Sequence, residues 1–324
     1  VETVLAAIAH PVRLQGRLIT PTASAGVVLA SAGQTATEVL RDADIAMYRA
    51  KHRGGSGYEF SDADMHKRAF DRLDLEGEIR HALSADEFRV HYQPIVDLRR
   101  DCKVVGFEAL VRWQHPTRGL LTPASFIDLA EETGLIVPLG QWVMRTAAAE
   151  VSRWAALLPD RPFSLSVNLA ARQLNEPGLV EEVTELVAAA GTWQLWLELT
   201  ESTLMDESTP GRPVLDQLTA AGVSLSIDDF GTGFSSLAYL TRLPVSALKI
   251  DRTFVHDLTR RAEAAPVAAA VIGLAASLGL DVVAEGVETE LQRDVLVEMG
   301  CRFGQGYLFA PPLEADAALA ALKA

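Results

Sequence analysis

The sequence predicts an α/β protein whose main part is a modified (β/α)8 TIM-type barrel with an antiparallel first strand. Short apolar segments alternate with longer helical patterns through most of the chain, which favours repeated strand–helix units and a mostly parallel sheet. Two strand-like segments precede this alternation and are joined by a short polar connection, as in a hairpin. The 324 residues suffice for one barrel of about 250 residues together with a smaller piece.

Composition narrows the functional classes. The net charge of −14 argues against polynucleotide binding, which normally needs a basic surface stripe. A small phosphorylated ligand stays open, because a metal ion can neutralise a local site. The two cysteines, Cys102 and Cys301, indicate reduced thiols in a cytoplasmic protein. The longest apolar stretch, Val267–Leu280, is too short to span a bilayer, although an anchoring segment upstream of Val1 is left open.

Residues 1–60 make the smaller piece. "SAGVVLA" (Ser24–Ala30) is typical of a short strand, and Thr35 and Glu38 have the spacing of a capping box that begins a helix. The glycine-rich "RGGSG" (Arg53–Gly57) ends that helix. Sixty residues with so little apolar surface do not make a complete domain on their own.

Residues 61–83 are predicted to form an amphipathic linker helix, and residues 84–324 the barrel. The hairpin that begins the barrel consists of Glu87–Leu98 and Val104–Trp113. Five short apolar strands follow, and helical patterns separate most of them. These strands are Phe163–Leu169, Leu195–Glu201, Val223–Phe230, Ala247–Asp251 and Asp281–Glu288.

Polar side chains stand at the ends of these strands. Asn168, Glu198 and Asp228 follow one another at intervals of thirty residues, which is one strand–helix unit each time. A single acid in such a place is most often a helix cap, but polar groups at five consecutive strand ends are improbable as a set of caps. Active sites of barrels lie at the carboxyl ends of the strands. The candidate set is Glu108, Asn168, Glu198, Asp228, Asp229, Lys249, Asp251 and Glu285.

This oxygen-rich set predicts a site for divalent cations. Carboxylates and an amide without histidine or cysteine favour Mg²⁺ or Mn²⁺ over Zn²⁺. The seven histidines lack metal-ligand spacing, and none is expected at a strand end. Two such ions suit an in-line displacement at phosphorus. Asp228 and Asp229 are adjacent, so each carboxylate can ligate a different ion. Lys249 and Asp251 lie two apart on a strand, so we expect the aspartate to hold the lysine in its charged form.

A glycine-rich segment, "DDFGTGFSS" (Asp228–Ser236), follows the third of these strands. It lacks the lysine of a phosphate-binding P-loop, and its G-x-G alone is a weak signal. Its position directly after two candidate ligands predicts a loop that gates the site.

At this point the residues resemble a family. "GFEALVRW" (Gly106–Trp113) is similar to the signature of EAL domains, the cyclic di-GMP phosphodiesterases, with Glu108, Ala109 and Leu110 as the name-giving triplet. The resemblance covers residues 72 to 324, and its family fold is a modified (β/α)8 barrel with an antiparallel first strand. The other motifs that carry it are "YQPIVDL", "SVNLAARQL", "LELTES", "IDDFGTGFSSLAYL", "LKIDRTFV", "VVAEGVET" and "GQGYLFAPP".

The resemblance implies a ligand set for two ions, Mg²⁺ or Mn²⁺. Asp229 would bind the second ion. The ligands of the first ion would be Glu108, Asn168, Glu198 and Asp228.

The resemblance also implies catalytic, loop-anchoring and substrate-binding residues. Lys249, supported by Asp251, would contact the water or the phosphate. Glu285 would be a general base or a further group of the metal site, and both roles stay open. Glu201 would anchor the "DDFGTGFSS" loop. The substrate-binding residues would be Gln93, Arg112, Gln305 and, less firmly tied to the motif, Glu288.

The resemblance implies that the chain would hydrolyse cyclic di-GMP to linear pGpG in bacterial signalling, and that it would form a homodimer through the EAL domain. The first region resembles the C-terminal part of a GGDEF (diguanylate cyclase) domain, through "SAGVVLA" and "ADIAMYRAKHRGGSGYEF" (Ala43–Phe60). The GGDEF turn itself is absent, so this incomplete N-terminal α/β fragment is not expected to synthesise cyclic di-GMP.

Two alternative functions remain. The first is a receptor module that binds cyclic di-GMP without hydrolysing it; such receptors tend to lose ligands, whereas this chain has every one of them. The second is a barrel phosphodiesterase that acts on glycerol phosphodiesters, which is expected to use histidines in its site. No histidine of this sequence is placed for that role.

Overall fold

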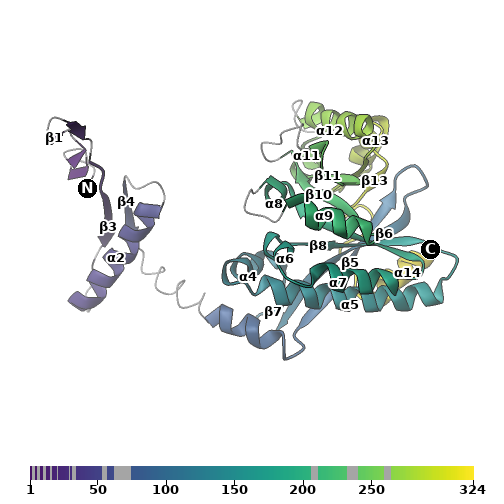
Figure 1. Cartoon of the computed structure of the whole chain (residues 1–324), viewed down its shortest axis with the longest axis horizontal. Coiled ribbons are helices and arrows are strands. Elements are labelled where there is room, and N and C mark those ends of the chain that lie inside the picture. Colours follow the sequence, from purple (N-terminus) through teal and green to yellow (C-terminus); the bar gives the residue numbers. More distant parts are fainter. Residues whose placement is uncertain are drawn as a thin grey trace. The chain divides into compact units, whose positions relative to one another are not determined.

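The computed structural model divides the chain into two units, Val1–Gly77 and Glu78–Ala324 (Figure 1). We describe each unit by itself. The structure describes residues 74–205, 211–231, 240–258 and 264–324 and, before them, residues 1, 4–5, 8–9, 12–14, 17–19, 21–28, 30, 34–52 and 57–61.

The N-terminal unit contains a β–α–β unit. Strands β3 (Ser24–Val28) and β4 (Gly57–Ser61) are parallel neighbours, and helix α2 (Ala36–His52) connects them. The expected capping box begins this helix, since the backbone N–H of Thr35 donates to Glu38 Oε2 at 2.7 Å and Glu38 returns a bond to the Thr35 hydroxyl. The helix packs closely on β3 at Gly26, where a Cβ atom would lie 1.9 Å from the carbonyl oxygen of Ala43.

Two features of this unit were not foreseen. β4 was missed by the sequence analysis, and a short antiparallel pair, β1 (Val12–Leu14) with β2 (Arg17–Ile19), precedes β3. Residues 53–56 of the predicted glycine-rich stop lie outside the described residues.

The predicted linker is described only in its last part. Residues 62–73 lie outside the described residues, and residues 74–82 are helical. Ile79 and Ala82 are buried, and Glu78 accepts a hydrogen bond from Arg118 at 2.8 Å. The end of the predicted linker therefore packs on the larger unit, and the division after Gly77 falls inside it.

Eight strands of the larger unit form a closed barrel. β5 pairs with β6 on one side and with β13 on the other, and it is antiparallel to both. The remaining neighbours, from β6 to β13, are parallel, so the predicted barrel with its antiparallel first strand is confirmed. The barrel strands are β5 (Phe88–Asp97), β6 (Lys103–His115), β8 (Phe163–Asn168), β9 (Trp193–Thr200), β10 (Ser224–Phe230), β11 (Ala247–Ile250), β12 (Asp281–Ala284) and β13 (Phe303–Gly304).

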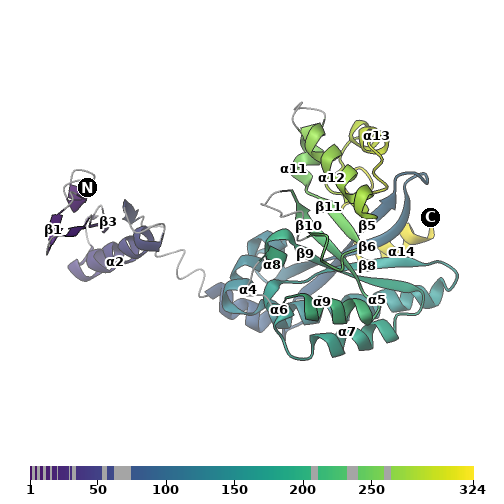
Figure 2. The same ribbon diagram turned by 45° about the horizontal axis from the view of Figure 1, so that its top comes forward.

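Helices cover the outside of the barrel. In both views α5, α7 and α9 lie on one side of the strands and α11 to α13 on another (Figures 1 and 2). Trp154 of α5 packs its ring on Tyr92 of β5 and Phe107 of β6, with centroids 4.9 and 5.3 Å away. The helices are α4 (Ile127–Thr133), α5 (Ile136–Leu157), α6 (Ala171–Leu174), α7 (Leu179–Ala188), α8 (Glu201–Met205), α9 (Gly211–Ala220), α11 (Arg252–Asp257), α12 (Ala264–Leu278), α13 (Glu290–Glu298) and α14 (Ala315–Lys323).

The structure contains two short strands that the sequence analysis did not predict, and it corrects one expectation about histidine. β13 has only two residues, and β7 (Gly119–Leu121), which extends the sheet beside β6, has three. The expectation that no histidine ends a strand was wrong, because His115 is the last residue of β6; its ring lies 3.3 Å from Glu78.

Across the described residues, no helix combines the length and apolar character that a membrane crossing requires.

Candidate active site

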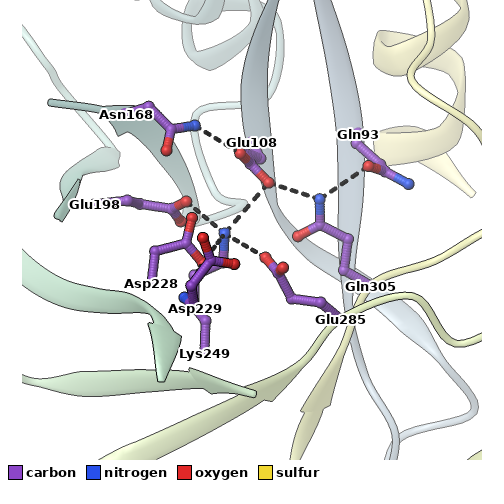
Figure 3. Close-up of polar contacts among 9 residues, drawn as sticks. All are labelled: Gln93, Glu108, Asn168, Glu198, Asp228, Asp229, Lys249, Glu285 and Gln305. Carbon is purple, nitrogen blue, oxygen red and sulfur yellow. Dashed lines mark hydrogen bonds and ion pairs between the residues drawn. The ribbon is translucent and has the colours of Figure 1, made fainter. Parts of the chain in front are cut away.

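The barrel strands bring the polar strand ends together at one mouth. In the sheet Asn168 lies beside Glu198, while Ser166, one layer deeper, lies beside Glu108. Successive side chains of a strand point to opposite faces, so Leu197 and Leu199 are buried under the helices and Glu198 points into the barrel. Figure 3 shows nine such side chains from different strands and loops meeting around one point.

Lys249 is the centre of this cluster (Figure 3). Its Nζ lies 2.5 Å from a carboxylate oxygen of both Glu198 and Glu285, and 3.4 Å from one of both Glu108 and Asp228. The side chain is 1% exposed. The surrounding carboxylates raise the pKa of Lys249 against the lowering effect of its burial, so the lysine stays charged. One ammonium group nevertheless faces four carboxylates.

Glu108 has partners on both of its oxygens. Asn168 Nδ2 donates to Oε1 at 2.7 Å, and Gln305 Nε2 donates to Oε2 at 2.8 Å. Burial raises the pKa of Glu108, but Lys249 and these two donors outweigh it and leave the pKa below its ordinary value. Gln305 also donates to Gln93 Oε1 at 3.0 Å, so both predicted glutamines join the cluster.

For the other carboxylates, the single positive charge of Lys249 does not offset burial and mutual repulsion. Burial, assisted by Asp228, raises the pKa of Glu285 to about 8, and Lys249 offsets only part of this. Burial together with Asp228 and Asp251 raises the pKa of Asp229 to about 6, and burial raises the pKa of Glu198 as well. These shifts indicate that the cluster as it stands is too negative for all of its acids to ionise at neutral pH.

The residues fit a divalent cation. Oxygens of Asp228, Asp229 and Glu285 lie within 4.8 Å of one another, which one cation can bridge at ligand distances of about 2.0–2.6 Å. Asp229 has a φ of 54°, in the left-handed region that few non-glycine residues adopt. Its backbone N–H donates to Asp228 Oδ1 at 2.9 Å. An all-oxygen set of this kind suits Mg²⁺ or Mn²⁺.

Asp251 lies differently from its predicted place. Its carboxylate caps α11, accepting from the backbone N–H of Thr253 at 2.9 Å and from the Thr253 hydroxyl. It also contacts the carboxyl group of Asp229 and contributes to its raised pKa. Within the described chain, the ion pairs of Lys249 are with the four carboxylates named above, and Asp251 is not among them.

Arg112 and Glu201 flank the cluster. Arg112 is half-buried beside Glu108 and Tyr307; its burial lowers its pKa, and these two neighbours act against that effect. Glu201 begins α8, and its Oε2 accepts the backbone N–H of Gly231 at 3.0 Å. It therefore holds the start of the "DDFGTGFSS" segment, whose residues 232–236 lie outside the described residues.

Glu288 is not brought to the cluster. It is exposed, and it lines a separate cavity of about 280 Å³ with Arg252 and His256.

The sequence analysis missed the barrel-facing residue Ser226, which lies two residues before Asp228 on β10, on the same face of the strand. The alternation of the strand carried this signal.

Comparison with known proteins identifies the family. Residues 76–312 match the family model of the EAL domain. The chain belongs to the EAL domain family. Residues 1–57 match the model described as the diguanylate cyclase GGDEF domain. Both resemblances stated from the sequence are thus confirmed for this EAL domain and the piece before it.

The relatives of this EAL protein include two from Pseudomonas aeruginosa. The bifunctional diguanylate cyclase/cyclic di-GMP phosphodiesterase MucR is 41% identical over 324 residues, which are 99% of this chain and 47% of MucR. The cyclic di-GMP phosphodiesterase NbdA is 44% identical over 307 residues, which are 94% of this chain and 39% of NbdA. The chain therefore spans less than half of the length of either relative.

Solved structures of EAL domains share the barrel. The PaMucR phosphodiesterase in complex with c-di-GMP has a TM-score of 0.71 and 42% identity, and the match covers 76% of this chain and 99% of that one. The EAL domain of Mycobacterium smegmatis DcpA has a TM-score of 0.62 and 40% identity, with 73% and 97% covered.

Divalent cations are expected to stabilise the metal-free chain. Mg²⁺ or Mn²⁺ at about 100 times its dissociation constant adds about 2.7 kcal/mol, which raises the melting temperature of the barrel by about 5–10 °C. Differential scanning calorimetry with EDTA and with each ion measures the shift. Asp229→Asn should lose most of it, and the exposed control Asp316→Asn should keep it. An equal shift in both variants would contradict a cation site at Asp229.

Proposed function

We propose that this EAL barrel hydrolyses cyclic di-GMP to linear pGpG in a reaction that depends on divalent cations. The convergence of Glu108, Asn168, Glu198 and Asp228 around Lys249 carries the proposal. MucR and NbdA, which are named as cyclic di-GMP phosphodiesterases, and the PaMucR complex with c-di-GMP support the substrate.

Five residues would hold the two cations. Glu108, Asn168, Glu198 and Asp228 would hold one ion and Asp229 a second. Ions held there would neutralise the substrate phosphate and make water more acidic.

Lys249 and Glu285 would handle the charge and the proton in this reaction. The charged Nζ of Lys249 would stabilise negative charge that develops on the phosphate oxygens. Glu285, whose pKa is raised to about 8 by burial and Asp228, would accept the proton of the attacking water. Its 2.5 Å contact with Lys249 would hold the accepting carboxylate in position. Asp251 would act through Asp229, whose carboxyl group it contacts.

The flanking residues would orient the dinucleotide. Arg112 would pair with a phosphate, for which a guanidinium offers two parallel donors. Gln93 and Gln305 would face the substrate at the barrel mouth; Gln305 donates hydrogen bonds to both Gln93 and Glu108. Glu201 would keep the "DDFGTGFSS" segment in register with the site through Gly231. Glu288 stays a predicted substrate contact.

The assay for this function uses the whole 324-residue chain. We expect linear pGpG to accumulate when the chain is incubated with cyclic di-GMP and Mg²⁺ or Mn²⁺, and not when EDTA replaces the ions. Chromatography of the nucleotides separates substrate from product. Tight calorimetric binding with unchanged cyclic di-GMP after hours with either ion would favour the receptor module and overturn the proposal.

The wider context of the chain also belongs to this proposal. Homodimerisation through the EAL domain, a cytoplasmic location and a role inside a longer GGDEF–EAL protein stay predictions. The match of residues 1–57 to the GGDEF model supports the last of these.

A further inference from the structure

The interior of the barrel is hollow below the carboxylate cluster. A cavity of about 430 Å³ begins at Glu198 and Lys249 and is lined by the first residues of several strands, among them Phe163, Trp193 and Ala247. It therefore reaches the end of the barrel where the parallel strands begin, opposite the candidate active site. Barrel interiors are normally filled by layers of bulky branched side chains, so a cavity here requires an explanation.

Small side chains create this cavity. On the inward faces of β8, β10 and β11, one layer below the cluster, stand Ser166, Ser226 and Ala247. Neighbouring strands place Ser226 directly beside Ala247. Trp196 of β9 also lines the cavity and keeps part of its surface exposed, although it points into the barrel.

Ser226 has an unused hydroxyl group in this cavity. The side chain is 2% exposed, and its Oγ has no hydrogen-bond partner among the described residues. A buried hydroxyl without a partner is unfavourable, and a ligand or water in the cavity would offset this cost. This hydroxyl is thus a polar group in a cavity whose lining also includes the aromatic residues Trp196 and Phe303.

We propose that this cavity is a second binding site, distinct from the substrate site, for a small neutral aromatic molecule that carries a hydroxyl or amide group. Its volume lies within the range of about 300–1,000 Å³ that small-molecule sites occupy, and such sites combine apolar walls with a few polar groups. Trp196, Phe303 and Val283 supply apolar surface, and Ser166 and Ser226 supply hydroxyls.

The charges in the cavity favour a neutral ligand. At the inner end Lys249 and Glu198 are paired at 2.5 Å, and at the outer end Arg302 lies 4.0 Å from Asp281. A charged ligand would have to compete with these pairs inside a space of low polarity. Because the inner end is formed by Glu198 and Lys249, a bound molecule lies directly below the cluster.

The probe for this site is 4-fluorophenol, a neutral ring with one hydroxyl group. In ¹⁹F NMR titrations of the full chain we expect saturable binding. Ser226→Val and Ser166→Val fill the cavity and remove a hydroxyl, so each should weaken binding about tenfold or more. Ser277→Val, the same change at an exposed position of α12, should leave the affinity unchanged.

Circular dichroism confirms that each variant is folded, and two cavity variants are used so that one misfolded protein does not end the test. Absence of saturable binding to the wild-type chain would overturn the proposal, because it would leave the cavity to water. Binding that Ser226→Val and Ser166→Val both leave unchanged would also overturn it, since the probe would then lie elsewhere.

Discussion

Glu108→Gln is expected to lower kcat for cyclic di-GMP hydrolysis by about 10³-fold or more. The change keeps the size of the side chain but removes the negative charge that lies 3.4 Å from Lys249 and would bind the first cation. A bound metal supplies several kcal/mol of transition-state stabilisation, and about 4 kcal/mol corresponds to about 10³ in rate. Steady-state assays with Mg²⁺ and with Mn²⁺ measure the loss.

A matched glutamate tests whether the effect belongs to the site. Glu314 is exposed and its side chain makes no capping bond to α14, so Glu314→Gln should retain full activity. Glu108→Gln should also bind Mn²⁺ more weakly in calorimetry, while Arg112 and the other flanking groups remain. Activity within about threefold of wild type would remove Glu108 from the ligand set.

Lys249→Met is expected to destabilise the metal-free barrel by about 3–5 kcal/mol, because it leaves four carboxylates without their buried counter-charge. Asp229 and Glu285 have folded pKa values raised to about 6 and about 8, chiefly by burial. Carboxylates with raised pKa values favour folding while they are protonated and lose that contribution as pH rises through the folded pKa. The destabilisation should therefore be larger near about pH 9 than near about pH 5.

Urea unfolding in EDTA at both pH values measures this difference. The control is Lys103→Met at the exposed start of β6, which should change the free energy of unfolding by less than about 0.5 kcal/mol at either pH. A cost for Lys249→Met that is the same at both pH values would show that the lysine acts through packing and not through its charge.

The barrel was predictable because its long strands show their pattern in the sequence. In β9 the alternation of Leu195, Leu197 and Leu199 with Glu198 reveals both the strand and its inward face. β13, with two residues, is too short for any period to be read. Gln305, which directly follows β13, was predicted from the family motif "GQGYLFAPP" and not from an alternating strand pattern.

The predicted contact of Lys249 with Asp251 shows where the two-residue repeat of a strand no longer predicts side-chain positions. Residues two apart share a face only while the strand continues, and β11 ends at Ile250. Asp251 is already the N-cap of α11, so its carboxylate turns to the N–H of Thr253. Contacts made after a strand has ended depend on backbone geometry that residue spacing alone does not contain.

The seam of the barrel, where β5 meets β13, joins Val96 and Asp97 to Phe303 and Gly304. These partners lie more than two hundred positions apart, so the ribosome must synthesise almost the entire domain before the barrel can close. Until then β5 offers an unpaired edge, which invites association between nascent chains. Synthesis that stops before Phe303 would yield a product without β13, and therefore without this seam, and without Gln305, one donor to Glu108.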